Sequence, residues 1–169
     1  MRLKNKVREL WAEDKAVVNG WLSIPSTVTA EINARAGFDS LTVDLQHGLN
    51  AYQSALSLLQ AISIGDSTPL ARVPWLEPGI VGKLLDAGAV GLICPMINTP
   101  KEAEAFVRYA RYAPDGERSF GPTRAVFEHG AGYANDANRQ IVTLAMIETT
   151  RALENLNAIV STPGLTGVY

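Results

Sequence analysis

Short apolar segments alternate with longer amphipathic segments along the chain, and this alternation limits the folds that the sequence can adopt. The apolar segments predict strands at residues 16–22, 41–45, 69–73, 90–94 and 141–147, and a sixth strand beginning at residues 166–169. Apolar residues at helical spacing, with their caps, predict helices at residues 3–12, 26–36, 51–62, 78–87, 100–112 and 150–160. Strands that are apolar throughout and alternate with helices are typical of a parallel sheet covered by helices.

Two architectures fit this order, a (β/α)₈ barrel and an open doubly wound sheet. No G-x-G-x-x-G segment follows the first predicted strand, so the dinucleotide-binding form of the open sheet has no support. Polar residues instead stand where predicted strands end: Asp44 and His47 after the second, Arg72 at the third, and Glu148 after the fifth. In a barrel, all strands open at their carboxyl ends onto one face, so these four side chains would converge. We therefore predict an α/β fold of the TIM (β/α)₈ barrel type.

The length of the chain conflicts with a complete barrel. Such barrels contain about 250 residues, whereas this chain has 169 and reaches its sixth predicted strand near its last residue. We expect residues 1–169 to form a single, partial barrel domain that covers about the first five to six β/α units. An unclosed parallel barrel exposes two strand edges and an apolar interior, so we expect a fragment or a chain that gains cover from a neighbouring copy.

Composition and charge exclude several classes of protein. Hydrophobic residues make up 47% of the chain and charged residues 19%, which favours a folded domain over a disordered chain. Fifteen Lys and Arg against 17 Asp and Glu, without a dense basic run, argue against a nucleic-acid partner. Cys94 is the only cysteine, no secretory signal is evident, and no apolar run is long enough to span a membrane. We therefore expect a cytoplasmic protein without a membrane segment.

The segment LQHG places His47 three residues after Asp44, at a predicted strand end. A carboxylate close to an imidazole can fix its tautomer and raise its basicity, which would suit a catalytic histidine. The alternative is a structural histidine that caps the end of the strand.

Arg72 and Glu148 also each allow two interpretations. A guanidinium at the mouth of a barrel can hold a carboxylate or a developing enolate oxygen, but Arg72 could equally be a surface cation before Pro74. Glu148 could be an oxygen ligand of a hard divalent cation, or an acid favoured by the dipole of the following helix. We interpret Cys94 as a buried apolar residue, Trp75 as a packing residue, and residues 114–132 as a loop in which His129 is exposed.

Five segments of the chain are similar to a known family: VDLQHG, ARVPW, LLDAGAVGLICPMINTPKEAEAFVRYARY, GERSFGPTRA and MIETTRALENL. In order and spacing they resemble the HpcH/HpaI aldolase and citrate lyase family, and in particular its metal-dependent pyruvate aldolases. The likeness spans nearly the whole chain. It implies a (β/α)₈ barrel and a Mg²⁺, Mn²⁺ or Co²⁺ ion that binds pyruvate.

The resemblance also implies roles for individual residues. His47 matches the catalytic histidine that transfers protons with a water, and Asp44 matches an acid that supports it. Arg72 matches the arginine that stabilises the enolate and contacts the substrate, and Glu148 matches one metal-ligand glutamate. Gln46, expected to contact the substrate, stands where many members have Glu.

Other features of the family extend beyond single residues of this chain. Met146 stands where many members have Gln, and the second metal carboxylate of the family lies in a segment that would follow Tyr169. Family members resemble one another in forming hexamers that exchange C-terminal helices, so a homo-oligomer is expected.

The resemblance predicts a metal-dependent aldolase that cleaves or forms 4-hydroxy-2-keto acids, with pyruvate as the enolate component. Its partners would be a small keto acid and an aldehyde. One alternative is a CoA-ester lyase of the citrate lyase beta type, which would be expected to carry a basic nucleotide-binding surface. A second alternative is a non-catalytic partial barrel that is stable only as an oligomer.

Overall fold

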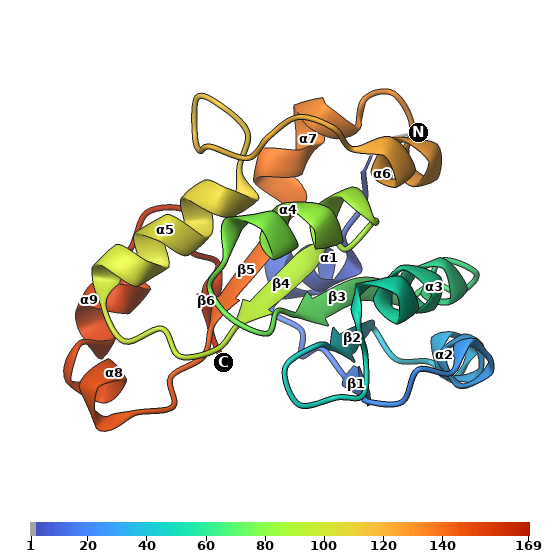
Figure 1. The fold of residues 1–169 in the computed structure, drawn as a ribbon, viewed down its shortest axis with the longest axis horizontal. Coiled ribbons are helices and arrows are strands. Elements are labelled where there is room, and N and C mark those ends of the chain that lie inside the picture. Colours follow the sequence, from blue (N-terminus) through green and yellow to red (C-terminus); the bar gives the residue numbers. More distant parts are fainter. Residues whose placement is uncertain (1–2) are drawn as a thin grey trace.

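The computed structural model describes residues 3–169, whose strands form one parallel, six-stranded sheet (Figure 1). The strands are β1 (Asn19–Leu22), β2 (Ser40–Asp44), β3 (Thr68–Arg72), β4 (Gly91–Cys94), β5 (Val142–Ala145) and β6 (Gly167–Val168). They are hydrogen-bonded in the order β1-β2-β3-β4-β5-β6, so each strand pairs with its neighbours in sequence. This is the order of a (β/α)₈ barrel, whereas a doubly wound sheet reverses its order at a switch point. The predicted fold class is confirmed.

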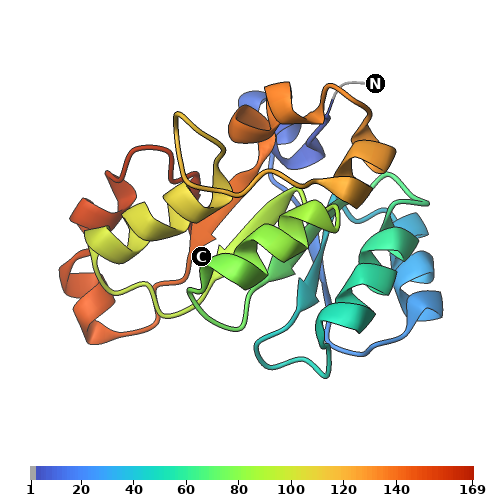
Figure 2. The ribbon, with the colours of Figure 1, turned by 45° about the horizontal axis from the view of Figure 1, so that its top comes forward.

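Helices follow the strands and cover the sheet from outside. They are α1 (Lys6–Ala12), α2 (Thr27–Arg35), α3 (Tyr52–Ile62), α4 (Pro78–Asp86), α5 (Pro100–Ala110), α6 (Thr123–His129), α7 (Tyr133–Gln140), α8 (Thr150–Glu154) and α9 (Leu156–Val160). The side chains of Ser26 and Thr99 cap α2 and α5 by accepting backbone N–H groups. Figures 1 and 2 show α2 and α3 at one end of the molecule and α8 and α9 at the other.

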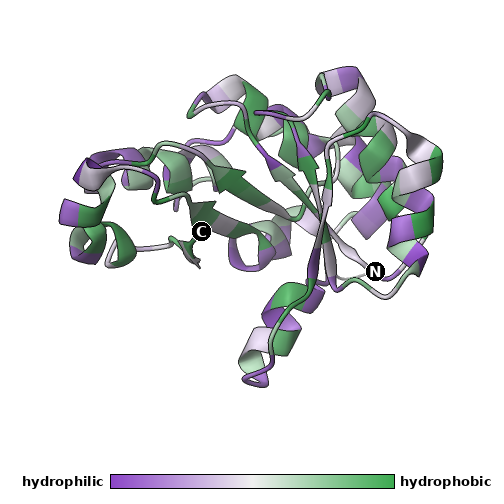
Figure 3. Ribbon diagram, turned by 90° about the horizontal axis from the view of Figure 1, so that it is seen from below, coloured by the Kyte–Doolittle hydropathy of each residue, from purple (hydrophilic) through white to green (hydrophobic). Residues whose placement is uncertain are grey.

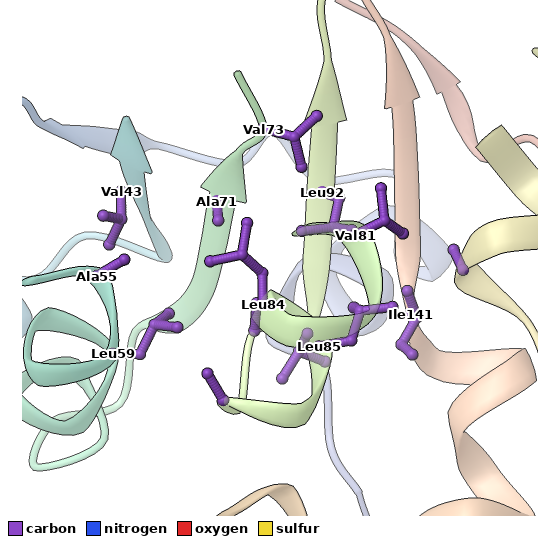
Figure 4. Packing of buried hydrophobic residues seen from close by; sticks show 14 of the residues in the cluster. Val43, Ala55, Leu59, Ala71, Val73, Val81, Leu84, Leu85, Leu92 and Ile141 are labelled. Carbon is purple, nitrogen blue, oxygen red and sulfur yellow. The ribbon is translucent and has the colours of Figure 1, made fainter. Parts of the chain in front are cut away.

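The hydrophobic core lies between the strands and the helices. Outward-facing strand residues such as Val43, Ala71 and Leu92 are buried against Leu84 and Leu85 of α4 and their neighbours (Figure 4). Each buried leucine or valine side chain contributes about 2 kcal/mol of transfer free energy. Figure 3 shows the hydropathy of each residue: some strands are strongly apolar, whereas the helices carry both apolar and polar residues.

The opposite face of the sheet is more polar. Side chains alternate across a strand, so Ser40, Thr42 and Asp44 share the face turned away from the helices. The two hydroxyl groups are hydrogen-bonded on this face: Ser40 Oγ and Thr42 Oγ1 donate to Asn19 Oδ1 at 2.8 and 3.0 Å. The parallel register pairs Thr42 with Trp21 and Asp44 with Arg72, which brings these four residues to the same inner face.

Helix α1 closes the amino-terminal end of the strands. Asn5 caps the helix through its side-chain oxygen, and its Nδ2 donates to the carbonyls of Val90 and Gln140 at 3.2 and 2.8 Å. Arg8 donates from Nε to the Gln140 carbonyl at 3.0 Å and from Nη2 to Thr166 Oγ1 at 3.1 Å. Asp44 and Arg72 lie at the opposite, carboxyl-terminal end of the strands.

Several local predictions were wrong. Residues 114–132 are not a plain loop, because α6 lies within them and α7 follows directly. His129 is half-buried rather than exposed, stacks on Tyr133 with ring centroids 5.8 Å apart, and has a pKa lowered by burial. Trp75 is 56% exposed and is not a packing residue. The predicted helix at 150–160 is divided at Asn155 into α8 and α9.

The buried position of Cys94 is confirmed, and burial raises the pKa of its thiol to about 12. Across residues 3–169, none of the helices has the length and apolar character needed to cross a membrane.

Candidate active site

Asp44 and Arg72 form a nearly buried ion pair where β2 and β3 end. Arg72 Nε donates to Asp44 Oδ1 at 2.8 Å, and Nη2 donates to Oδ2 at 2.7 Å. The side chain of Arg72 is only 11% exposed and that of Asp44 only 3%. This two-point contact follows from the register, which places Asp44 directly opposite Arg72 on adjacent strands. Two of the residues predicted for the site are therefore in direct contact.

Trp21 of β1 contacts both members of this pair, and no pattern in the sequence predicts this contact. Its indole Nε1 donates to Asp44 Oδ2 at 3.3 Å, and the guanidinium carbon of Arg72 lies 4.9 Å from its ring centroid. The ring of Tyr169, after β6, stacks on Trp21 at a centroid distance of 5.8 Å and an interplanar angle of 29°. The first and last strands thus meet through aromatic side chains.

The pKa of the Asp44 carboxyl reflects these contacts. Burial acts to raise it, but the hydrogen bonds from Arg72, from two backbone N–H groups and from Trp21 outweigh burial and lower it from 3.8 to about 2. A carboxyl whose pKa is lower in the folded state stabilises the fold above its unfolded pKa.

We therefore expect stability to depend on pH in acid. A pKa lowered to about 2 contributes about 2 kcal/mol, present in full above about pH 4 and lost as the pH falls through about 2. Urea unfolding of the wild type between about pH 5 and pH 2 measures this loss. The Asp44→Asn variant should lack this component, and an equally steep dependence in the variant would contradict the assignment to Asp44.

The segment after β2 carries Gln46 and His47. The backbone N–H groups of Gln46 and His47 donate to Asp44 Oδ1 at 3.0 and 3.3 Å. Asp44 thus holds the main chain of His47; among the described residues, no hydrogen bond joins its carboxylate to the imidazole. The His47 side chain is exposed, while Gln46 Oε1 is enclosed and has no hydrogen-bond partner within residues 3–169.

The glycine after His47 is required by a close approach of the main chain. A Cβ on Gly48 would lie 2.3 Å from the backbone oxygen of Asp44, well inside the contact distance of real Cβ atoms. Asn50 completes the turn, since its Nδ2 donates to the carbonyls of Leu22 and Asp44 at 3.0 and 3.1 Å. The LQHG segment therefore folds back over the end of β2 and presents His47 to solvent.

Glu148 follows β5 and is exposed. Its Oε2 accepts the backbone N–H of Met96 at 2.7 Å, across the neighbouring loop after β4. Met96 has a φ of +58°, a left-handed conformation that costs about 1 kcal/mol in a non-glycine residue. Asn98 links the loops after β4 and β5. Its side chain is hydrogen-bonded to Thr149, and its backbone carbonyl accepts a hydrogen bond from Asn155 Nδ2 at 2.9 Å.

Arg72 also reaches toward β5. Its Nη1 lies 3.9 Å from the sulfur of Met146, a weak acceptor two residues before Glu148. Nη1 is thus the one nitrogen of this guanidinium without a strong partner among residues 3–169, and it lies between the ends of β3 and β5.

The described residues fit a metal ion only in part. Glu148 offers the oxygen chemistry that hard divalent cations prefer, but Oε2 already accepts one hydrogen bond. No group of three His, Cys, Asp or Glu within residues 3–169 lies close enough together to hold a metal. This donor set fits a weakly held, water-rich cation of the Mg²⁺ type, which commonly takes one or two carboxylates together with substrate oxygens.

Comparison with known proteins agrees with this fold. The sequence profile described as HpcH/HpaI aldolase/citrate lyase matches residues 19–169. The chain is 42% identical to hydroxypyruvate/pyruvate aldolase of Rhizorhabdus wittichii, over 98% of this chain and 66% of the relative. It is 35% identical to 4-hydroxy-2-oxo-heptane-1,7-dioate aldolase of Escherichia coli, over 99% of this chain and 65% of the relative. The chain therefore spans just under two thirds of the length of these curated relatives.

Solved structures support the same assignment. A crystal structure of an HpcH/HpaI aldolase/citrate lyase family protein from Burkholderia cenocepacia superimposes with a TM-score of 0.89 at 33% identity, covering 98% of this chain and 68% of that protein. Because the family profile matches residues 19–169 and the strands have the parallel order of this fold, the chain belongs to the HpcH/HpaI aldolase/citrate lyase family.

Proposed function

We propose that the protein is an aldehyde-lyase that cleaves or forms 4-hydroxy-2-keto acids, with pyruvate as the enolate component. The observation that carries this proposal is the Asp44–Arg72 pair, which holds a guanidinium at the strand ends with Nη1 left for a ligand oxygen. The names of the two relatives above, both aldolases acting on oxo acids or pyruvate, support the choice of an aldolase over a CoA-ester lyase.

Each proposed residue has a distinct part in cleavage. His47, acting through a water, removes the proton of the 4-hydroxyl group, and the bond between C3 and C4 then breaks to release the aldehyde. The electron pair passes into the enolate of pyruvate, whose developing oxygen charge Arg72 stabilises from Nη1. The same acid–base group returns the proton to C3 to give pyruvate, while Gln46 contacts the substrate.

Asp44 holds Arg72 and the main chain of His47 in place. Glu148 would supply one ligand to Mg²⁺, Mn²⁺ or Co²⁺. The bound ion would polarise the ketone of the substrate.

Further properties of the whole protein are part of the same proposal. Residues 1–169 form one partial barrel domain that works in a homo-oligomer in the cytoplasm, with small keto acids and aldehydes as its partners. Size-exclusion chromatography tests the assembly, and a well-behaved monomer would contradict it.

The aldolase proposal is tested by pyruvate release from a panel of 4-hydroxy-2-keto acids, coupled to lactate dehydrogenase. We expect turnover, with added Mg²⁺, Mn²⁺ or Co²⁺, by a chain that includes the segment with the second metal carboxylate, no turnover with chelator, and a loss of about a hundredfold or more in His47→Ala. The control is His129→Ala, which removes the other histidine, on α6. Metal-independent release, or equal rates in His47→Ala and the wild type, would refute the proposed chemistry.

A further inference from the structure

The carboxylate of Asp44 is crowded with donors. Its Oδ2 accepts from Arg72 and Trp21, and its Oδ1 accepts from Arg72 and from the backbone N–H groups of Gln46 and His47. A carboxylate offers about four lone-pair sites. All the directions around it are therefore in use, and the geometry of the Arg72 contact depends on the other donors that share this carboxylate.

Within residues 3–169, Trp21 contacts both charged groups of this ion pair. The indole N–H donates to the acid at 3.3 Å, while the ring lies 4.9 Å from the guanidinium carbon. A cation over an indole ring is stabilised by the ring quadrupole, more strongly where water is displaced. Arg72 is 11% exposed at this point, so the ring contacts a guanidinium that is already largely shielded from water.

Trp21 is in turn restrained from β6. The Tyr169 ring stacks on it at a centroid distance of 5.8 Å, and the backbone of Tyr169 is fixed because its N–H donates to the Ala145 carbonyl at 2.8 Å. A chain of contacts therefore runs from the sheet's last strand through Trp21 to Arg72.

We propose that Trp21 is a positioning residue of the candidate active site: its N–H and ring together fix the guanidinium plane of Arg72, so that Nη1 faces the reacting oxygen. The expected fall in kcat rests on the proposed function, whereas the orientation of Arg72 by Trp21 does not. Loss of the indole leaves Asp44 with one donor fewer and lets the guanidinium tilt. Productive alignment is then lost in the transition state more than in ground-state binding.

The test compares Trp21→Phe, which keeps an aromatic ring but removes the N–H, with Trp11→Phe, a matched change on the 42% exposed Trp11 of α1. In Trp21→Phe we expect the carboxyl ¹³C titration to show a pKa of Asp44 above the wild-type value of about 2. We also expect kcat to fall about tenfold with KM nearly unchanged. Trp11→Phe should change neither quantity.

The two readouts separate the two proposals. If a chain that includes the segment with the second metal carboxylate shows no turnover, the aldolase proposal fails, and the Asp44 titration still decides the role of Trp21. An unchanged Asp44 pKa in a folded Trp21→Phe variant would overturn the positioning role, as would an unchanged kcat in an active enzyme. If Trp21→Phe fails to fold, Tyr169→Leu removes the supporting ring instead, and the same shifts, smaller in size, are required.

Discussion

Replacing Arg72 with alanine is expected to lower the free energy of unfolding by about 3 kcal/mol, because it leaves Asp44 buried without its cation. The side chain of Asp44 is only 3% exposed, so water replaces the lost donors poorly. The same change should lower kcat/KM for pyruvate release by about a thousandfold, the effect of removing a donor aimed at developing oxygen charge. Urea unfolding and the coupled pyruvate assay measure the two losses.

Two further variants sharpen this experiment. Arg72→Lys keeps the charge but cannot reproduce the two-point contact with Asp44, so most of the catalytic loss should remain while much of the stability returns. Arg35 provides the control, because it pairs with Glu31 on α2 and its side chain is 61% exposed. Arg35→Ala should change the unfolding free energy by less than about 1 kcal/mol. Full activity in Arg72→Lys would show that charge alone suffices.

Replacing Arg118 with leucine is expected to destabilise the protein by about 3 kcal/mol. Its side chain is 1% exposed and donates to Asp86 Oδ1 at 2.6 Å and to the Tyr133 hydroxyl at 3.0 Å. Its guanidinium carbon also lies 4.4 Å from the ring centroid of Tyr112. One buried cation therefore joins α4, α7 and the segment between α5 and α6, and its loss should loosen all three.

A double-mutant cycle with Asp86→Asn isolates the ion pair within this cluster, with an expected coupling of about 1–3 kcal/mol in urea unfolding. Arg108→Leu is the matched control, since its pair with Glu117 is about half exposed and should contribute much less to stability. Equal losses in Arg118→Leu and Arg108→Leu would show that burial of the pair is unimportant.

The repeating part of the fold could be predicted because it depends on local pattern. Apolar runs located the strands to within a few residues, and prolines at first turns located α4 and α5. The helices α6 and α7 were missed because their sequences, TRAVFEH and YANDANRQ, carry few apolar residues at helical spacing. Contacts distant in sequence hold them, such as those from Arg124 to the Ala87 carbonyl and from Asn138 to Tyr112.

The candidate site, like the fold, was predictable only in part. Parallel order alone brings Asp44 and Arg72 to one end of the sheet, so their approach follows from the sequence. The hydrogen-bond partner of the Asp44 carboxylate was not predicted. Sequence spacing suggested the imidazole of His47, whereas the strand register places the guanidinium of Arg72 against it. Trp21 was missed because its contacts with Asp44, Arg72 and Tyr169 join residues far apart in the sequence, which no local pattern encodes.

The hydrogen bonds of α1 have a consequence for the order of folding. Arg8 bonds Gln140 and Thr166, which lie 132 and 158 residues further along the chain. During synthesis, α1 is made long before the residues that Arg8 contacts, Gln140, Ile141 and Thr166. Contacts of such large sequence separation form late because the intervening chain must first be ordered. We therefore expect α1 to dock onto the sheet only after the chain through Thr166 has been ordered.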